Sequence, residues 1–352
     1  MSKYFSNKYK NLVPYVPGEQ PKDNDYIKLN TNESPFPPSE KAVALAGEAA
    51  KKLHLYSDPT ASVLTEKVAD MVGVQKNQVL MTNGSDEILN FAFMSFCDEN
   101  TPAVFPDISY GFYKVFAQIN NLPYEEIPLK DDFTINVDDY VGINKTIFIA
   151  NPNAPTGIAL TLDEIEKIVS TNPDNVVVID EAYVDFGGES AVSLVDKYSN
   201  LLVTQTFSKS RSMAGMRIGF AVGNPELIKY LNDVKYSFNS YTMNRTSICC
   251  GVEAVKDDEY FKETTTKIIE TREWAKEELT KLGFTFPDSM ANFIFATHKE
   301  VPAKEIFAAL REANIYVRYF NSPRIDNYLR ITIGTKDEMK KLFEFLRAYL
   351  EK

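Results

Sequence analysis

Two residues of this chain, a lysine and an aspartate, lie near the ends of apolar runs and could do chemistry. Lys209 follows the run at 201–204 after a short polar stretch, and Asp180 closes the run at 176–179. A lysine can form an imine with a carbonyl compound, and a buried carboxylate can pair with a protonated ring nitrogen. These are two of the groups that pyridoxal 5'-phosphate needs from a protein, so we predict that cofactor.

Two segments near these residues could hold the cofactor's phosphate. Gly84, Ser85 and Asp86 lie between an apolar run and a predicted helix. Free N–H groups and the helix dipole attract an anion at such a point. Ser208 and Arg217 flank the lysine and offer a hydroxyl and a guanidinium for the same anion. An ordinary turn with a helix cap is the alternative for the first segment.

Aromatic and cationic side chains elsewhere could complete the site. Tyr183 lies three residues after Asp180 and could hydrogen-bond the cofactor's phenolic oxygen, and Tyr110 could stack on its ring. Core packing with a satisfied hydroxyl is the alternative for a tyrosine. Arg318 and Arg330 lie among apolar residues in predicted strands. A guanidinium there needs a planar anionic partner unless that face of the strand is exposed.

Composition excludes several other functions. The chain has 352 residues, 44% hydrophobic and 25% charged, as is typical of a globular protein with about two domains. A net charge of −11 argues against nucleic acid as a partner. The two histidines, His54 and His298, have no metal-binding spacing and accompany no GxSxG segment. We therefore expect neither a metal site nor a serine hydrolase.

The sequence favours a cytoplasmic protein. No apolar run reaches the roughly 18 residues that a membrane-spanning helix needs. The first ten residues contain no apolar segment typical of a signal peptide. The three cysteines, Cys97, Cys249 and Cys250, are too few for a disulfide framework and fit a reducing compartment. We therefore expect no membrane partner.

Apolar runs alternate with helical patterns over the first two thirds of the chain. This alternation predicts an α/β architecture with a mostly parallel sheet, since continuous apolar strands suit a sheet covered on both faces. The predicted strands are 79–82, 103–105, 145–150, 176–179 and 201–204. The predicted helices are 39–53, 61–72, one that ends at 96, and one at 161–169.

The pattern changes to longer helices and short strands after about residue 224. The helices are predicted at 225–234, 246–257, 259–282 and 336–350, and the strands at 291–296, 316–319 and 328–333. We predict a large cofactor-binding domain at 31–240 and a smaller α+β domain at 241–352, which the N-terminal arm, 1–30, joins.

The polar segments that could do chemistry all follow predicted strands. They lie at 83–86, 106–110, 151–157, 180–183 and 208–217. Ligands of open α/β sheets bind outside the carboxyl ends of the strands. We therefore expect these five segments to form one shared site.

Together these residues resemble the fold-type I pyridoxal-phosphate aminotransferases, most closely the histidinol-phosphate aminotransferases. The resemblance covers nearly the whole chain. It is carried by the segments 29–35, 56–59, 83–89, 151–157, 180–183, 208–209, 215–219, 289–292 and 329–335. It implies the fold-type I architecture, with a large domain and a smaller one.

The resemblance also implies roles around the cofactor. Lys209 looks like the Schiff-base lysine that becomes the base of the proton shift, and Asp180 like the partner of the pyridine nitrogen. Tyr183 would contact the phenolic oxygen, and Tyr110 would stack on the ring. The phosphate would be held by residues that offer N–H, hydroxyl or guanidinium donors, namely Gly84, Ser85, Asp86, Ser208 and Arg217.

Substrate and partner contacts follow from the same resemblance. Arg330 looks like the arginine that binds a carboxylate, and Arg318 with Tyr15 would suit a substrate phosphate. Tyr56 is similar to a tyrosine that family members lend to the cofactor of the partner subunit. The resemblance therefore implies a homodimer with shared sites.

One position departs from the family pattern. The family usually has an asparagine near the phenolic oxygen where this chain has Ala154, which Asn153 precedes. Two explanations stay open. Either Asn153 takes that place after a small backbone shift, or Tyr183 makes the contact alone.

We therefore expect a transaminase that exchanges an amino group between L-histidinol phosphate and 2-oxoglutarate in histidine biosynthesis. Its substrates would be a phosphorylated amino alcohol and a 2-oxo acid. An aromatic-amino-acid aminotransferase or a threonine-phosphate decarboxylase would share every cofactor residue. A non-catalytic cofactor-binding regulator is the remaining alternative, and the acidic charge and the lack of an appended DNA-binding segment argue against it.

Overall fold

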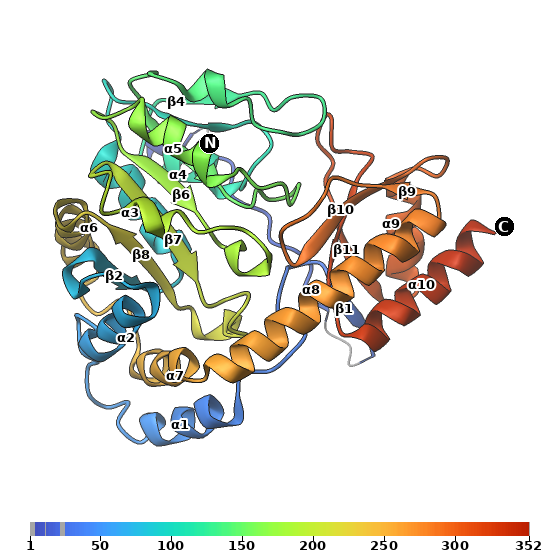
Figure 1. Cartoon of the computed structure of the whole chain (residues 1–352), viewed down its shortest axis with the longest axis horizontal. Helices are drawn as coiled ribbons and strands as arrows, with labels where there is room; N and C mark the ends of the chain where they lie inside the picture. Colours follow the sequence, from blue (N-terminus) through green and yellow to red (C-terminus); the bar gives the residue numbers. More distant parts are fainter. Residues whose placement is uncertain (1–3, 11, 22–24, 352) are drawn as a thin grey trace.

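Two β-sheets organise the chain, and each has its own apolar core (Figure 1). The computed structural model describes residues 4–10, 12–21 and 25–351. The larger sheet lies between two layers of helices, and three further helices cover the smaller sheet.

The larger sheet has the strand order β2-β8-β7-β6-β5-β3-β4. The bounds are β2 (Val79–Thr82), β3 (Ala103–Pro106), β4 (Tyr124–Ile127), β5 (Thr146–Ala150), β6 (Val177–Asp180), β7 (Leu201–Thr206) and β8 (Gly219–Gly223). Neighbours run parallel, except that β8 is antiparallel to both β2 and β7. The predicted α/β architecture with a mostly parallel sheet is confirmed.

Apolar side chains on both faces of the strands explain the two helical layers. In β6, Val177 and Ile179 belong to one core, and Val178 belongs to the other. The first core includes side chains of α2 (Ser62–Val72), α5 (Leu162–Ser170) and α7 (Arg245–Lys256). The second core includes side chains of α3 (Ser85–Phe96), α4 (Phe112–Ile119) and α6 (Pro225–Phe238).

The smaller sheet has the order β1-β11-β12-β10-β9. Its strands are β1 (Ile27–Leu29), β9 (Phe284–Thr285), β10 (Phe293–His298), β11 (Ile315–Tyr319) and β12 (Leu329–Thr332). Its helices are α8 (Asp258–Lys281), α9 (Ala303–Glu312) and α10 (Lys336–Leu350). The smaller α+β unit predicted from the sequence is confirmed, and β1 joins it by pairing in parallel with β11.

Local signals set several element ends. Thr161 and Glu164 form the predicted capping box at the start of α5. Gly73 ends α2 in a left-handed conformation. The elements β4, β8, β9, α4 and α9 were not predicted from the sequence. Short 3-10 helices also occur, at η1 (Asn7–Tyr9), η2 (Lys76–Gln78), η3 (Val137–Tyr140), η4 (Val184–Phe186), η5 (Ala191–Leu194) and η6 (Ala214–Met216).

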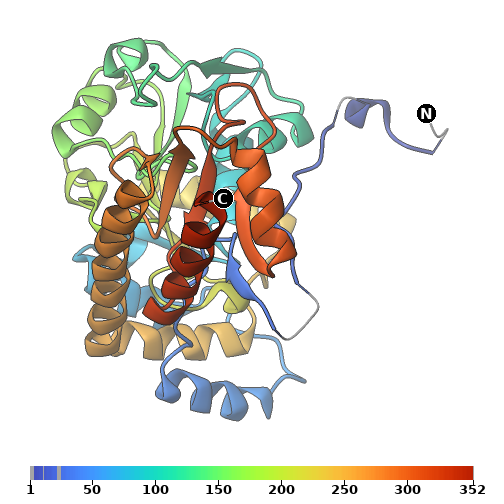
Figure 2. The ribbon, with the colours of Figure 1, turned by 90° about the vertical axis from the view of Figure 1, so that its right-hand side faces the viewer.

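The contacts of α7 bear on the boundary between the two units. This helix packs against α1 (Glu40–Ala50) and α2, and its buried residues belong to a core of the larger sheet. The division at 31–240 stays a prediction, and we propose a boundary near Asp257, where α8 begins. The segment of the N-terminal arm around η1 projects from the body (Figure 2), whereas Tyr15 stacks on Phe112 of α4.

No helix within residues 4–10, 12–21 and 25–351 combines the length and the apolar content that crossing a membrane requires.

Gly219 in β8 allows a close approach between the larger sheet and the start of α3. A Cβ atom at this position would lie 2.4 Å from both the carbonyl carbon of Gly84 and the backbone nitrogen of Ser85. Backbone atoms cannot rotate away as a flexible side chain can, so a methyl group would push β8 and the start of α3 apart.

Gly219→Ala should lower the free energy of unfolding by roughly 1–3 kcal/mol, because the added methyl overpacks backbone against backbone. Urea unfolding of the two purified proteins measures the difference. Gly47→Ala is the control, since a Cβ there meets nothing within 4 Å in α1. That change should raise the unfolding free energy by up to about 1 kcal/mol. An unchanged midpoint for Gly219→Ala would show that the close approach is not under constraint.

Candidate active site

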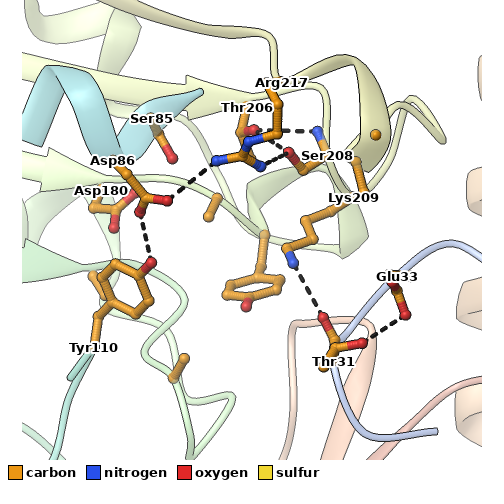
Figure 3. Close-up of a pocket in the computed structure, with 16 residues that line it drawn as sticks. Thr31, Glu33, Ser85, Asp86, Tyr110, Asp180, Thr206, Ser208, Lys209 and Arg217 are labelled. Carbon is orange, nitrogen blue, oxygen red and sulfur yellow. Dashed lines mark hydrogen bonds and ion pairs between the residues drawn. The ribbon is translucent and has the colours of Figure 1, made fainter. Parts of the chain in front are cut away.

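A cavity of about 370 Å³ lies where β5, β6 and β7 end (Figure 3). Ala150, Asp180 and Thr206, the last residues of these strands, all line it. The other lining residues come from segments that follow strands of the two sheets, including β1, and they are Thr31, Glu33, Ser85, Asp86, Tyr110, Ala154, Ala182, Tyr183, Ser208, Lys209, Ala214, Gly215 and Arg217. Most of the cofactor residues predicted from the sequence therefore lie together.

Lys209 reaches into this cavity from the segment after β7. Its Nζ donates a hydrogen bond to the backbone oxygen of Thr31 over 3.3 Å. Burial lowers the pKa of Lys209 to about 8, and the charges of Arg330 and Arg217 act in the same direction against Glu33 and Asp86. A lysine with a lowered pKa is partly neutral near neutral pH, which a nucleophilic amine requires.

Asp180 lines the cavity and is only 4% exposed. Its carboxylate accepts hydrogen bonds from the hydroxyls of Tyr113, at 3.2 Å, and Thr204, at 3.1 Å. Burial raises the pKa of Asp180 to about 6, although these hydrogen bonds oppose the rise. A cationic partner would stabilise the ionised form, so the carboxylate fits a protonated ring nitrogen.

The groups predicted to hold a phosphate gather around Arg217. Its Nη2 lies 3.2 Å from Oδ2 of Asp86, and its Nη1 donates to Oγ of Ser208 over 3.5 Å. Gly84 adopts φ +88°, and a Cβ there would lie 2.6 Å from Nη2 of Arg217. Ser85 begins α3, and the first N–H groups of a helix have no partner within it. This arrangement fits a phosphate.

Tyr110 joins the same network. Its hydroxyl donates to Oδ1 of Asp86 over 2.6 Å, and its ring borders the cavity. Burial, together with the nearby charge of Asp86, raises the pKa of this hydroxyl. The tyrosine therefore stays neutral near neutral pH and keeps its ring at the cavity wall.

A second cavity, of about 970 Å³, adjoins the first and shares Tyr110, Tyr183 and Lys209 with it. Arg330 lines this second cavity and donates from Nη2 to the backbone oxygen of Asn30 over 3.1 Å. Its buried Nε has no hydrogen-bond partner among the described residues. A buried donor atom without a partner is costly unless an anion binds it, so Arg330 fits a carboxylate.

Tyr15 and Arg318 also line the second cavity. Arg318 donates to the backbone oxygens of Val16, at 3.0 Å, and Pro17, at 3.3 Å. The ring of Tyr15 stacks on Phe112 with ring centroids 4.3 Å apart. Neutral carbonyl partners leave the charge of Arg318 uncompensated, so this arginine fits a second anion beside the arm.

Two residues proposed for the site lie away from it. Tyr56 is 79% exposed and stacks on Tyr241 rather than lining either cavity. The amide of Asn153 lies behind the cavity wall and donates to the backbone oxygen of Ile108, at 3.0 Å, and to Thr156. Ala154, next to it, lines the cavity instead. The cofactor roles of Tyr56 and Asn153 stay predictions.

Sequence reasoning did not single out several residues that the site uses. Tyr113 and Thr204, which hold Asp180, and Thr31, which accepts from Lys209, are examples. Tyr113 lies three residues after Tyr110, and this spacing on one face of a helical turn was a usable signal. Over the same described ranges, no group of three or more histidine, cysteine or acidic side chains could hold a metal ion.

Comparisons with known proteins agree with this site. The family model for aminotransferase class I and II matches residues 24–346. Histidinol-phosphate aminotransferases from Brachyspira hyodysenteriae and Clostridium botulinum are 52% and 51% identical over 353 residues, each covering 100% of both chains. The crystal structure of histidinol-phosphate aminotransferase from Sinorhizobium meliloti, in complex with pyridoxal-5'-phosphate, has a TM-score of 0.88 at 21% identity and covers 99% of both chains.

The lowered pKa of Lys209 predicts how stability depends on pH. Its ordinary pKa is 10.5 and its pKa in the folded chain is about 8. Between these values the unfolded chain binds more protons, so the unfolding free energy that Lys209 contributes rises with pH. Below about pH 8 the free energy of unfolding is lowered by the full cost of burying the charged amine.

Lys209→Met should therefore stabilise the cofactor-free protein at pH 7 by roughly 1–3 kcal/mol. The gain should shrink as the pH approaches the pKa of an ordinary lysine. Urea unfolding at several pH values measures this. The exposed Lys304 gives the matched control, and Lys304→Met should change the unfolding free energy by less than about 0.5 kcal/mol. A loss of stability with Lys209→Met at pH 7 would contradict the buried charge.

Proposed function

The chain belongs to the class I and II aminotransferase family and, within it, to the histidinol-phosphate aminotransferases, and from that premise we propose its reaction. It exchanges an amino group between L-histidinol phosphate and 2-oxoglutarate in histidine biosynthesis, with pyridoxal 5'-phosphate as cofactor. The observation that carries this proposal is the common cavity of Lys209 and Asp180, with Arg318 and Arg330 lining the cavity beside it.

Each residue of the first cavity has a separate role toward the cofactor. When bound, pyridoxal phosphate supplies an electron sink for negative charge at the substrate's α-carbon. Asp180 keeps the ring nitrogen protonated, because a carboxylate beside a cation favours the charged form. Ser208, Arg217 and the N-terminus of α3 would hold the phosphate, and Tyr110 would lie against the ring.

Lys209 moves the proton. With a pKa of about 8, its amine is partly neutral near neutral pH, so it can take a proton from the substrate's α-carbon and return it to another atom. Partial burial of the side chain and the hydrogen bond to Thr31 limit the contact of the Nζ group with bulk water. This burial favours transfer between the amine and the substrate over loss to solvent.

The second cavity has to accept two kinds of anion in turn. The amino donor carries a phosphate and no carboxylate, whereas the oxo acid carries two carboxylates. Arg330 suits a carboxylate because its buried Nε has an unused donor, and Arg318 suits the second anion at the arm. Tyr15, from the arm, borders the same space and would lie against the bound donor.

A homodimer in the cytoplasm completes the proposal. Tyr56 is highly exposed, and Leu53, Leu55, Phe238 and Tyr241 are exposed as well. Exposed apolar and aromatic side chains of this kind are typical of an interface between subunits. Arg245 donates to the backbone oxygen of Tyr56 over 2.6 Å, and the ring of Tyr56 stacks on Tyr241. Tyr56 would then reach the cofactor of the partner subunit.

Arg318→Ala tests the amino donor. It should slow amino transfer from L-histidinol phosphate about 100-fold and from phenylalanine less than about 10-fold, because the phosphorylated donor alone loses charge-assisted hydrogen bonds. Stopped-flow absorbance of the bound cofactor over a single turnover gives both rates, for the wild type and the variant.

Arg311→Ala is the control for the arm. Arg311 binds the arm at Glu19, at 3.0 and 2.8 Å, yet it does not line the second cavity. Its loss should leave the ratio of the two rates unchanged. Equal losses for both donors with Arg318→Ala would favour an aromatic amino donor. Release of carbon dioxide without any need for a 2-oxo acid would favour a decarboxylase.

Mixing two variants tests the shared site. Tyr56→Ala and Lys209→Ala should each be strongly impaired in pure form. After joint unfolding and reassembly, activity should reach about one quarter of the wild type, since half of the dimers are hybrids with one intact site of two. Activity that stays at the level of the pure variants would contradict a tyrosine lent between subunits, and sedimentation of the wild type as a monomer would contradict the dimer.

A further inference from the structure

Asn32 is a buried residue of the site that no role described above includes. It is 1% exposed and adopts φ 57°, a left-handed conformation that asparagine tolerates. Its side-chain Nδ2 donates to the hydroxyl oxygen of Tyr183 over 2.9 Å. Its backbone oxygen accepts from Nδ2 of Asn292 over 2.9 Å. Asn32 thus links the segment after β1 to the tyrosine at the cofactor cavity.

Thr332 fixes which way the Asn32 amide faces. The backbone N–H of Asn32 donates to Oγ1 of Thr332 over 3.0 Å, and the same hydroxyl donates to Oδ1 of Asn32 over 3.0 Å. A backbone N–H can only donate, so the Thr332 oxygen accepts there and its hydrogen needs an acceptor. The reverse amide orientation would remove that acceptor in a buried place. The Asn32 nitrogen therefore faces Tyr183.

The direction of these bonds decides what the Tyr183 hydroxyl can do. Its oxygen accepts the hydrogen of Asn32, so its own hydrogen is left to donate elsewhere. Tyr183 lines both cavities, and its ring is held edge-on against Phe293 with centroids 5.1 Å apart. A hydroxyl held in this way presents its hydrogen to an oxygen of a ligand in the cavity.

Over residues 4–10, 12–21 and 25–351, no second side-chain amide hydrogen-bonds the Tyr183 hydroxyl. Ala154 lines the cavity and has no polar side chain, and Asn153 directs its amide to Ile108 and Thr156 instead. Among the described residues, the side-chain amide that lies within hydrogen-bond distance of the Tyr183 hydroxyl is therefore that of Asn32.

We propose that Asn32 is a positioning residue that holds the Tyr183 hydroxyl as a donor toward the phenolic oxygen of the bound cofactor. Ala154, which lines the same cavity, offers that oxygen no side-chain hydrogen bond. The inference rests on the proposed function, since it needs pyridoxal phosphate in the cavity. Asn32 acts through Tyr183 and does not itself contact the reacting atoms.

The test is the pH at which the absorbance band of the bound cofactor changes. A hydrogen bond from Tyr183 stabilises the anionic phenolic oxygen, so it lowers that midpoint. In Asn32→Asp, the aspartate can adopt the same backbone conformation, but it places an acceptor where the amide donor was. Tyr183 then donates to the aspartate instead of to the cofactor. The midpoint should rise by about one pH unit, as in Tyr183→Phe.

The double variant separates this effect from the added charge of the aspartate. If Asn32 acts through the hydroxyl, Asn32→Asp should shift the midpoint by about one unit less in the Tyr183→Phe background than in the wild type. Asn32→Gly keeps the left-handed backbone without a charge, and it gives the same cycle if the aspartate variant does not fold. The shift of the midpoint pH that Asn32→Gly causes should disappear in the Tyr183→Phe background.

The outcomes are distinct. Equal shifts in both backgrounds, with a normal cofactor band in the wild type, would overturn the role of Asn32 and leave the proposed function standing. A wild-type protein that forms no band with added pyridoxal phosphate would overturn the proposed function and this inference with it. A shift that depends on the Tyr183 hydroxyl supports the proposal.

Discussion

The structure depends on placing charged groups at buried or partly buried positions beside two adjoining cavities. Asp180 is 4% exposed, Lys209 and Arg330 are partly buried, and desolvation shifts the pKa of each in the direction that favours its neutral form. A buried charge is stable only with a partner or a bound counter-ion. The unused donor on Arg330 and the neutral hydroxyls around Asp180 show that the protein alone does not supply all of these partners. The ligands complete them.

The architecture makes this arrangement possible. Parallel strands end at one edge of a sheet, so β5, β6 and β7 deliver Ala150, Asp180 and Thr206 to the same cavity. The smaller sheet closes the site from the other side, because β12 carries Arg330 and β11 carries Arg318. Residues that follow β1 then bridge the two units, as the bond between Asn32 and Tyr183 illustrates.

Sequence reasoning predicted the parts of this molecule that local patterns encode. Continuous apolar runs gave β6 and β7, and a capping box gave the start of α5. The edge strand β4 was missed because its sequence, Tyr-Glu-Glu-Ile, is polar and has no apolar run. The orientation of Asn153 and the bond from Arg318 to Val16 depend on tertiary contacts, and the latter joins residues that are 302 positions apart. Spacing in the sequence carries no signal for such contacts.

The role of Lys209 is tested most sharply by locating the lysine that binds the cofactor. The protein is loaded with pyridoxal phosphate, reduced with sodium borohydride and digested, and its peptides are identified by mass spectrometry. We expect one modified lysine, Lys209, because among the lysines of the described residues it is the one that lines the cofactor cavity. Modification of a different lysine, or of no lysine while the cofactor is bound, would show that Lys209 does not form the Schiff base.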